Sequence, residues 1–282
     1  MTGVQVWVDG RLVDPAAASI SAVDHGLTVG DGVFETLKVV DGVPFARRRH
    51  AARLQRSLAG MGLPAADFAV IDAGIEAVLR SPLEFGRLRY TVTGGRGPLG
   101  SDRLTGALTY VVTAGPSPRP GPSCTLVTVP WTRNERSATT GVKTTSYAEN
   151  VIALAYAKER GADEAVFANT AGDLCEGTGS NVFVVRDGVL STPPAQAGPL
   201  LGVTRELVLE WGREWGRTAG VEVREVRVPL ADLVTADEVF VTSSTRDVLP
   251  ATSVDGRSLP VGPVTTALRA LFARRAAEQV DP

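Results

Sequence analysis

The lysine in GVKTTSYAEN, residues 141–150, stands out because lysine is rare in this chain. It occurs only at Lys38, Lys143 and Lys158, and arginine supplies the rest of the 29 basic residues. Lys143 precedes a segment of helical pattern, and the small side chains around it leave room for a ligand. An amine that bonds covalently to a carbonyl must lose its proton near neutral pH, which requires burial or a nearby positive charge. On composition alone, a surface lysine and a functional lysine are equally good interpretations of Lys143.

The composition is that of a globular protein, with 44% hydrophobic and 21% charged residues among 282. The net charge is −2 without a basic block, so we expect binding to neither nucleic acid nor a membrane surface. No apolar run is long enough to cross a membrane, and the N-terminus does not resemble a signal peptide. Cys124 and Cys175 form no CxxC pattern, and the only histidines are His25 and His50. These features predict a cytoplasmic protein without a metal site.

A proline- and glycine-rich stretch, GPSPRPGPS at 115–123, divides the chain. Such a stretch is typical of a linker. We therefore predict an N-terminal domain at 1–114, a linker at 115–123 and a C-terminal domain at 124–282. Strands and helices are mixed without strict alternation, which predicts an α+β fold. Many short strands in the second part indicate a barrel-like or curved sheet there.

Two motifs that carry chemistry in other proteins are weak here. GGRGPLG, residues 94–100, matches a dinucleotide-binding pattern of glycines, but a strand rather than a helix follows it. A glycine-rich loop between two strands is the better interpretation. The chain has no GxSxG motif, and neither histidine lies in a catalytic turn, so a serine hydrolase is not indicated.

Several residues could bind an anionic, ring-containing ligand. Glu176 lies between apolar residues and a glycine-rich turn, where it is either a turn cap or a buried acid with a cationic partner. Val203 and Thr204 open a predicted helix, whose N–H groups and dipole attract anions. Hydroxyl side chains occupy 242–245 at the end of a strand, and Arg53 could supply positive charge. Taken singly, each is more often an ordinary cap or surface residue.

Together, these segments resemble the class IV aminotransferases, the fold-type IV family of pyridoxal phosphate enzymes. The motifs, in chain order, are GDGVFE (30–35), HxxRL (50–54), KTTSYAEN (143–150), EGTGSNVF (176–183), LLGVTRE (200–206) and VTSSTRDVLP (241–250). The resemblance covers almost the whole chain. It implies a small α/β domain and a larger barrel-like domain with pyridoxal 5'-phosphate between them. It also implies a homodimer in which the neighbouring subunit completes the substrate pocket.

The resemblance implies a role for each matching residue. Lys143 matches the lysine that holds the cofactor covalently and later carries protons. Glu176 matches the acid that pairs with the pyridine nitrogen, and Arg53 matches the arginine at the phosphate. The other residues implied to contact the cofactor are Tyr147, Val203, Thr204, Ser244 and Thr245.

The family includes branched-chain aminotransferases, D-amino acid transaminases and 4-amino-4-deoxychorismate lyases. Residues 30–36, GDGVFET, resemble the lyases most, because Thr36 stands where they carry a threonine linked to catalysis. Thr36 is also simply a β-branched residue that suits a strand. Phe34 and Arg89 are predicted to contact the substrate, and an arginine suits a substrate carboxylate. Val29 and Arg87 depart from the aromatic residues usual in branched-chain enzymes.

We therefore expect a lyase that releases pyruvate and 4-aminobenzoate, a step in folate synthesis. A class IV transaminase for branched-chain or D-amino acids is the alternative. A non-catalytic protein that retains the fold is a third possibility, which the filled cofactor positions disfavour.

Overall fold

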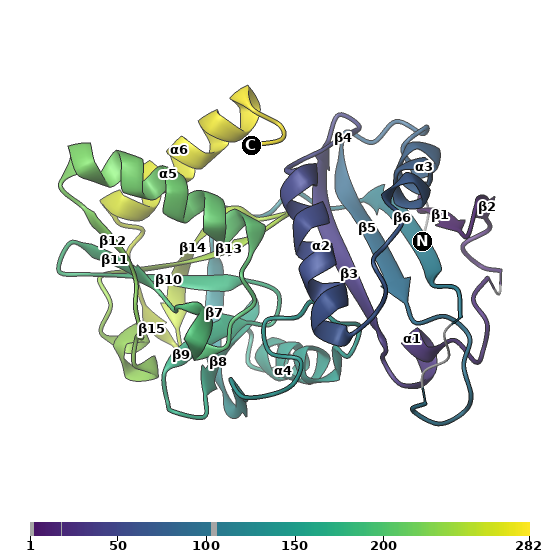
Figure 1. Cartoon of the computed structure of the whole chain (residues 1–282). Coiled ribbons are helices and arrows are strands. Elements are labelled where there is room, and N and C mark those ends of the chain that lie inside the picture. Colours follow the sequence, from purple (N-terminus) through teal and green to yellow (C-terminus); the bar gives the residue numbers. More distant parts are fainter. Residues whose placement is uncertain (1–2, 18, 103–105) are drawn as a thin grey trace. The chain divides into compact units, whose positions relative to one another are not determined.

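The chain forms two compact units in a computed structural model that describes residues 3–17, 19–102 and 106–282 (Figure 1). Unit 1 comprises residues 1–119, 142–147 and 280–282, and unit 2 comprises residues 120–141 and 148–279. The change from unit 1 to unit 2 after Arg119 falls inside the range 115–123. Unit 1 also includes the short segment that carries Lys143, although this segment comes after residue 123.

Unit 1 contains a six-stranded antiparallel sheet with the order β2-β1-β6-β5-β3-β4 (Figure 1). Its strands are β1 (Gln5–Val8), β2 (Arg11–Val13), β3 (Gly32–Val40), β4 (Val43–Pro44), β5 (Phe85–Thr93) and β6 (Thr109–Pro116). The end of β6 corrects the sequence-based expectation for 115–123. Gly115 and Pro116 continue this strand and pair with Arg87 and Gly86, so the irregular stretch begins only afterwards.

Asp-Gly pairs make the tight turns of this sheet. Asp9 and Gly10 have φ of 42° and 100°, and Asp41 and Gly42 have φ of 49° and 77°. Positive φ at both central residues is the requirement of a type I′ turn, and each pair joins two antiparallel strands, β1 to β2 and β3 to β4.

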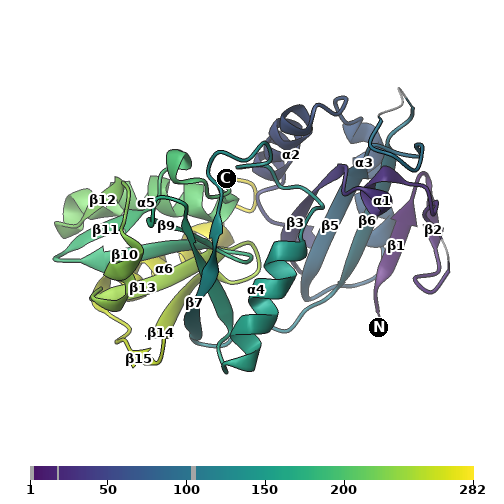
Figure 2. The same ribbon diagram turned by 90° about the horizontal axis from the view of Figure 1, so that it is seen from below.

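Helices α2 (Arg47–Met61) and α3 (Phe68–Val78) cover one face of the sheet, while α1 (His25–Thr28) is a single turn before β3 (Figures 1 and 2). Leu54 and Leu58 of α2 and Ile71 of α3 are almost fully buried in the core with Val33 and Leu37 of β3. Gly62 ends α2 in the left-handed conformation, with φ of 67°, as its position in the sequence predicts.

Unit 2 contains a nine-stranded mixed sheet that curls into a half-barrel (Figure 2). The order is β12-β11-β10-β13-β14-β7-β8-β9, with β15 beside β14. The strands are β7 (Cys124–Arg133), β8 (Glu164–Asn169), β9 (Leu174–Gly177), β10 (Asn181–Arg186), β11 (Val189–Thr192), β12 (Glu222–Glu225), β13 (Glu238–Ser243), β14 (Asp247–Val254) and β15 (Arg257–Ser258). The predicted α+β class with a barrel-like second sheet is confirmed.

The helices of unit 2 pack on this sheet from two sides (Figure 1). They are α4 (Ala148–Glu159), α5 (Val203–Ala219) and α6 (Pro263–Glu278), with short 3₁₀ turns at Ala195–Ala197 and Leu230–Val234. Helix α4 packs on β7 and β8, whereas α5 and α6 contact β13. Among the described residues, no helix is long and apolar enough to cross a membrane.

Candidate active site

The segment that carries Lys143 lies along the start of β3. The backbone N–H of Phe34 donates to the carbonyl oxygen of Lys143 at 3.0 Å, and Thr145 donates to the carbonyl of Gly32 at 2.8 Å. The hydroxyl of Ser57 in α2 accepts a hydrogen bond from the Lys143 backbone at 3.2 Å. Backbone hydrogen bonds to a sheet and a helix therefore fix the position of this lysine.

The side chain of Lys143 lies against two aromatic rings. Its Nζ is 4.3 Å from the centre of the Phe34 ring and 3.5 Å from the hydroxyl oxygen of Tyr147. The rings of Phe34 and Tyr147 meet edge to face, with centres 5.2 Å apart. Thus Tyr147, which the resemblance implies at the cofactor, is a direct neighbour of the lysine amine.

Arg89 joins the same cluster from β5. Its guanidinium carbon is 3.6 Å from the centre of the Phe34 ring, a cation–π contact. Thr36 is directly opposite Arg89 in the β3–β5 pairing. Because side chains alternate along a strand, Phe34 and Thr36 lie on one face of the sheet and Glu35 on the other. The predicted lysine, its tyrosine and the two predicted substrate contacts, Phe34 and Arg89, are therefore neighbours in unit 1.

Arg53 lies on the face of the unit 1 sheet that α2 and α3 cover, and Glu35 binds its guanidinium. Its Nε and Nη2 donate to the two carboxylate oxygens at 2.8 and 2.6 Å, while His50 Nδ1 is 2.6 Å from the same carboxylate. All three side chains are buried. Burial alone would raise the pKa of Glu35, but the contacts with Arg53 and His50 outweigh it and lower that pKa to about 2. Burial lowers the pKa of His50, with Arg53 and Lys143 adding to the effect and Glu35 opposing it.

Glu176 lies in β9 of unit 2, where it contacts a backbone N–H and an arginine. One carboxylate oxygen accepts a hydrogen bond from the backbone N–H of Leu200 at 3.0 Å, and the other is 3.5 Å from Nε of Arg133. Arg133 is held in turn by Glu149 and Asn150, to which its Nη atoms donate at 2.8 and 2.7 Å. Glu176 is half-buried, and it has features of both interpretations: it accepts a backbone hydrogen bond and it lies beside a cation.

The start of α5 lies close to Glu176, because Leu200, which donates to the Glu176 carboxylate, comes three residues before the helix. Asn181 Nδ2 donates to the carbonyl of Leu200 at 2.7 Å, which fixes the approach to the helix. Val203 and Thr204 are the first two residues of α5 and are buried, with Gly202 at the N-cap. Their N–H groups belong to the first turn, where a helix has no internal acceptors, so they form a potential anion site.

Ser244 and Thr245 occupy the tight turn between β13 and β14. The pairing of Ser243 with Asp247 leaves only residues 244–246 in this turn. Both predicted hydroxyls are therefore at the end of a strand, as the sequence indicates, and both are partly exposed.

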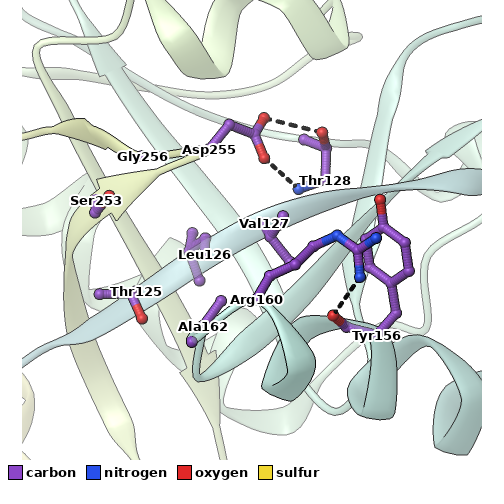
Figure 3. Close-up of a pocket in the computed structure, with 11 residues that line it drawn as sticks. Thr125, Leu126, Val127, Thr128, Tyr156, Arg160, Ala162, Ser253, Asp255 and Gly256 are labelled. Carbon is purple, nitrogen blue, oxygen red and sulfur yellow. Dashed lines mark hydrogen bonds between the residues drawn. The ribbon is translucent and has the colours of Figure 1, made fainter.

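A cavity of about 480 Å³ lies in another part of unit 2. Figure 3 shows residues that line it. Its lining includes Thr128, Tyr156, Arg160 and Asp255, and it contains none of the predicted site residues. The carboxylate of Asp255 is already bonded to the backbone and hydroxyl of Thr128 at 2.7 and 2.9 Å, and Arg160 stacks on Tyr156. We assign no role to this cavity.

The two cysteines are both free and buried. Burial raises the pKa of Cys124 to about 12 and raises that of Cys175 as well. Neither thiol is therefore a nucleophile at neutral pH.

The sequence matches the family model described as "Amino-transferase class IV" over residues 32–254. The chain belongs to this family, whose members are pyridoxal phosphate-dependent enzymes. A protein of Methanocaldococcus jannaschii with the provisional name branched-chain-amino-acid aminotransferase is 35% identical over 278 residues, 95% of either chain. The D-alanine aminotransferase of Bacillus licheniformis is 30% identical, covering 92% of this chain and 91% of that protein.

Solved structures show the same fold. The branched-chain aminotransferase of Thermoproteus uzoniensis with norvaline has a TM-score of 0.87 at 30% identity, covering 96% of this chain and 94% of that one. A hypothetical aminotransferase of Mycobacterium tuberculosis in its PLP-bound form has a TM-score of 0.82 at 28% identity, covering 98% and 100%. A provisional 4-amino-4-deoxychorismate lyase of Legionella pneumophila has a TM-score of 0.84 at 25% identity, covering 93% and 97%.

The residues present fit pyridoxal phosphate. The donor set contains an amine, a carboxylate, hydroxyls and a helix start, which match the aldehyde, the ring nitrogen and the phosphate. Nε of Arg133, 3.5 Å from the Glu176 carboxylate, and Oγ1 of Thr242, two residues before Ser244, are buried without a hydrogen-bond partner. Polar groups in this state are typical of a site that a polar ligand completes.

Sequence reasoning missed the partners that hold the predicted residues. Glu35 and His50 surround Arg53, and Arg133 lies beside Glu176. The signal for Glu35 was present in GDGVFE, where a carboxylate follows the apolar residues Val33 and Phe34.

Proposed function

We propose that this protein is an amino acid transaminase that moves an amino group between an amino acid and a 2-oxo acid. The observation that carries the proposal is the cluster of Lys143, Phe34 and Arg89. The lysine amine and the guanidinium contact the same aromatic ring, at 4.3 and 3.6 Å from its centre. This arrangement offers a proton-carrying amine and a carboxylate-binding cation to one small substrate.

In this proposal Lys143 binds pyridoxal phosphate covalently and afterwards carries the proton at the α-carbon of the substrate. The Tyr147 hydroxyl accepts a hydrogen bond from Nζ at 3.5 Å and so orients the amine. Arg89 binds the substrate carboxylate. Bound pyridoxal phosphate supplies an electron sink for the negative charge that forms at the α-carbon.

The other predicted site residues are proposed to bind the ring and the phosphate of the cofactor. Glu176 holds the ring nitrogen in its protonated form, and the hydrogen bond from Leu200 together with Arg133 fixes the carboxylate. The residues proposed at the phosphate are Arg53, Val203, Thr204, Ser244 and Thr245. Backbone N–H groups, hydroxyls and a guanidinium are the donors that bind phosphate in proteins.

The names of the related proteins favour transamination over the lyase reaction. The two relatives described above are a branched-chain and a D-alanine aminotransferase by name, and the lyase-like structure is less similar at 25% identity. The lyase remains a second candidate on one observation. Thr36 lies directly opposite Arg89, so its hydroxyl is on the same face of the sheet as the Lys143 cluster.

We also propose that the protein is a homodimer. Helix α4 exposes an apolar side formed by Val151, Ile152 and Leu154, and Trp131 of the adjoining β7 is 45% exposed. Trp131 contacts Tyr156 of α4 edge to face, so these residues form one patch. A contiguous apolar patch of this kind is typical of a protein interface.

The product assay tests the proposed reaction. Purified protein with pyridoxal phosphate is incubated with 2-oxoglutarate and, separately, L-leucine, L-valine or D-alanine, and glutamate formation is measured. We expect glutamate with at least one donor. A parallel reaction contains 4-amino-4-deoxychorismate and no oxo acid. Release of pyruvate and 4-aminobenzoate there, without glutamate in the first reactions, would assign the lyase instead.

A further inference from the structure

Arg246 is the third residue of the turn that carries Ser244 and Thr245. Its side chain folds back rather than extending away from the turn. Nε donates to the hydroxyl of Ser243 at 3.0 Å, and Nη2 donates to a carboxylate oxygen of Glu164 at 2.6 Å. The guanidinium therefore bridges the end of β13 to the start of β8.

Glu164 also holds the loop that follows Glu176. Its first carboxylate oxygen accepts from the backbone N–H of Thr178 at 3.0 Å and from the Thr178 hydroxyl. Its second accepts from Ser180 Oγ at 3.1 Å as well as from Arg246. Glu164 is 2% exposed, so these are buried, charge-assisted hydrogen bonds, which are stronger than neutral or exposed ones.

We propose that Arg246 and Glu164 are positioning residues for the cofactor phosphate. The pair fixes the turn at 244–246 to the loop at 177–180, and so holds the hydroxyls of Ser244 and Thr245 where the phosphate binds. The inference rests on the proposed function, because it takes the turn as a phosphate site. Donors fixed before the ligand arrives bind it more tightly, since less ordering remains to be done on binding.

Direct binding of the phosphate by Arg246 is the competing explanation. The two explanations predict different effects of Glu164→Gln on phosphate binding. Glu164→Gln keeps the shape of the side chain but removes the charge that holds Arg246. If Arg246 acts through the turn, this change weakens phosphate binding. If Arg246 contacts the phosphate itself, releasing the arginine leaves the binding unchanged or strengthens it.

The experiment compares two ligands that differ only in the phosphate. Full-length apoprotein is titrated with pyridoxal phosphate and with pyridoxal, and binding is followed by absorbance. The dissociation constant for pyridoxal, divided by that for pyridoxal phosphate, gives a ratio that measures the contribution of the phosphate to binding. Loss of a charged hydrogen bond that positions the turn should reduce this ratio about tenfold or more in Arg246→Gln and in Glu164→Gln. Pyridoxal affinity should change less in both variants.

The outcomes separate the explanations. An unchanged ratio in Arg246→Gln overturns the inference, and so does equal loss of affinity for both ligands, which would indicate a general structural role. A reduced ratio in Arg246→Gln but not in Glu164→Gln assigns direct contact and also overturns it. If the wild-type protein shows no saturable binding of pyridoxal phosphate, the proposed function itself fails.

Two further variants complete the test. Arg186→Gln is the matched control, because Arg186 donates to Asp232 at 3.0 Å in an exposed ion pair of the same unit. Its ratio should equal that of the wild type. If Arg246→Gln does not fold, as judged by thermal melting of the apoprotein, Arg246→Lys replaces it. Lysine keeps the charge but lacks the planar fork that reaches Ser243 and Glu164 together, so an intermediate loss is expected and no loss contradicts the inference.

Discussion

Glu35 and Arg53 form a buried, two-pronged ion pair between β3 and α2, with donor–acceptor distances of 2.8 and 2.6 Å. The carboxylate is inaccessible to solvent and the arginine is 5% exposed. A buried charge is tolerated only with a partner, so each residue requires the other. The pair therefore fixes the guanidinium that we propose at the phosphate. Replacing either Glu35 or Arg53 should lower the stability of the fold.

Replacing Glu35 should destabilise unit 1. Glu35→Gln leaves the Arg53 charge buried without its counter-charge, which should cost about 3–5 kcal/mol of unfolding free energy. Denaturant unfolding of wild type and variant measures the difference. Glu84→Gln is the control, because Glu84 pairs with Arg119 at 3.0 Å but is 81% exposed, and less than about 1 kcal/mol is expected there. Equal costs for the two variants would contradict the importance of the buried pair.

Acid should destabilise the fold in two stages. The pKa of His50 lies below its ordinary value of 6.5, so the unfolded chain gains this proton first, and stability falls as the pH drops below 6.5. Glu35 has a pKa of about 2 against 4.5, so the stability that it contributes above pH 4.5 is lost as the pH falls towards 2. Each group adds a slope of up to about 1.4 kcal/mol per pH unit.

Unfolding free energies between pH 7.5 and 3 measure this profile. His50→Gln removes the first stage, so its decline between pH 6.5 and 4.5 should be shallower than that of the wild type. Parallel profiles for the two proteins would show that His50 titrates alike in the folded and unfolded chains.

Arg133 should act on turnover through Glu176. Its Nε is 3.5 Å from the Glu176 carboxylate, and its other contacts hold it in place. Arg133→Gln should lower kcat about 10- to 100-fold with a small change in KM, because misplacing a catalytic group affects the reaction more than substrate binding. The absorption spectrum of the holoprotein should also change with pH differently from the wild type. Arg160→Gln, in an exposed position of the same unit, is the control, and an equal effect there would exclude the positioning role.

The apolar side of α4 should control assembly. Ile152 is 55% exposed, and Ile152→Lys should convert a dimer to a monomer in light scattering, because a charge in an apolar interface is costly. Val234→Lys, at a residue that is 38% exposed in a different part of unit 2, should remain dimeric. A wild-type monomer, or dimers of both variants, would rule out this patch as the interface.

Local patterns allowed much of the fold to be predicted. The Asp-Gly pairs at 9–10 and 41–42 indicated hairpins because few residue pairs adopt positive φ together, and Gly62 indicated the end of α2 for the same reason. The strand β6 extends two residues into the stretch at 115–123 that we predicted as a linker. Gly115 and Pro116 disfavour strands locally, but pairing with β5 outweighs this preference.

The candidate site was predictable only in part. The rarity of lysine and the family motif indicate Lys143, but its contact with Phe34 depends on pairing between segments more than a hundred residues apart. Glu35 and Arg53 meet only because α2 crosses β3, and no sequence period links them. Thr36 led to the prediction of the lyase reaction, whereas similarity along the whole chain favours transamination. One residue carries less information about the substrate than the full pocket does.

Covalent attachment of the cofactor tests the central claim most directly. The chain has only three lysines, so borohydride reduction of the holoprotein followed by peptide mapping can locate the attachment unambiguously. We predict that the reduced cofactor is found on Lys143 alone and that Lys143→Ala carries none. Attachment at Lys38 or Lys158, or a Lys143→Ala protein that still retains the cofactor after reduction, would contradict the assignment.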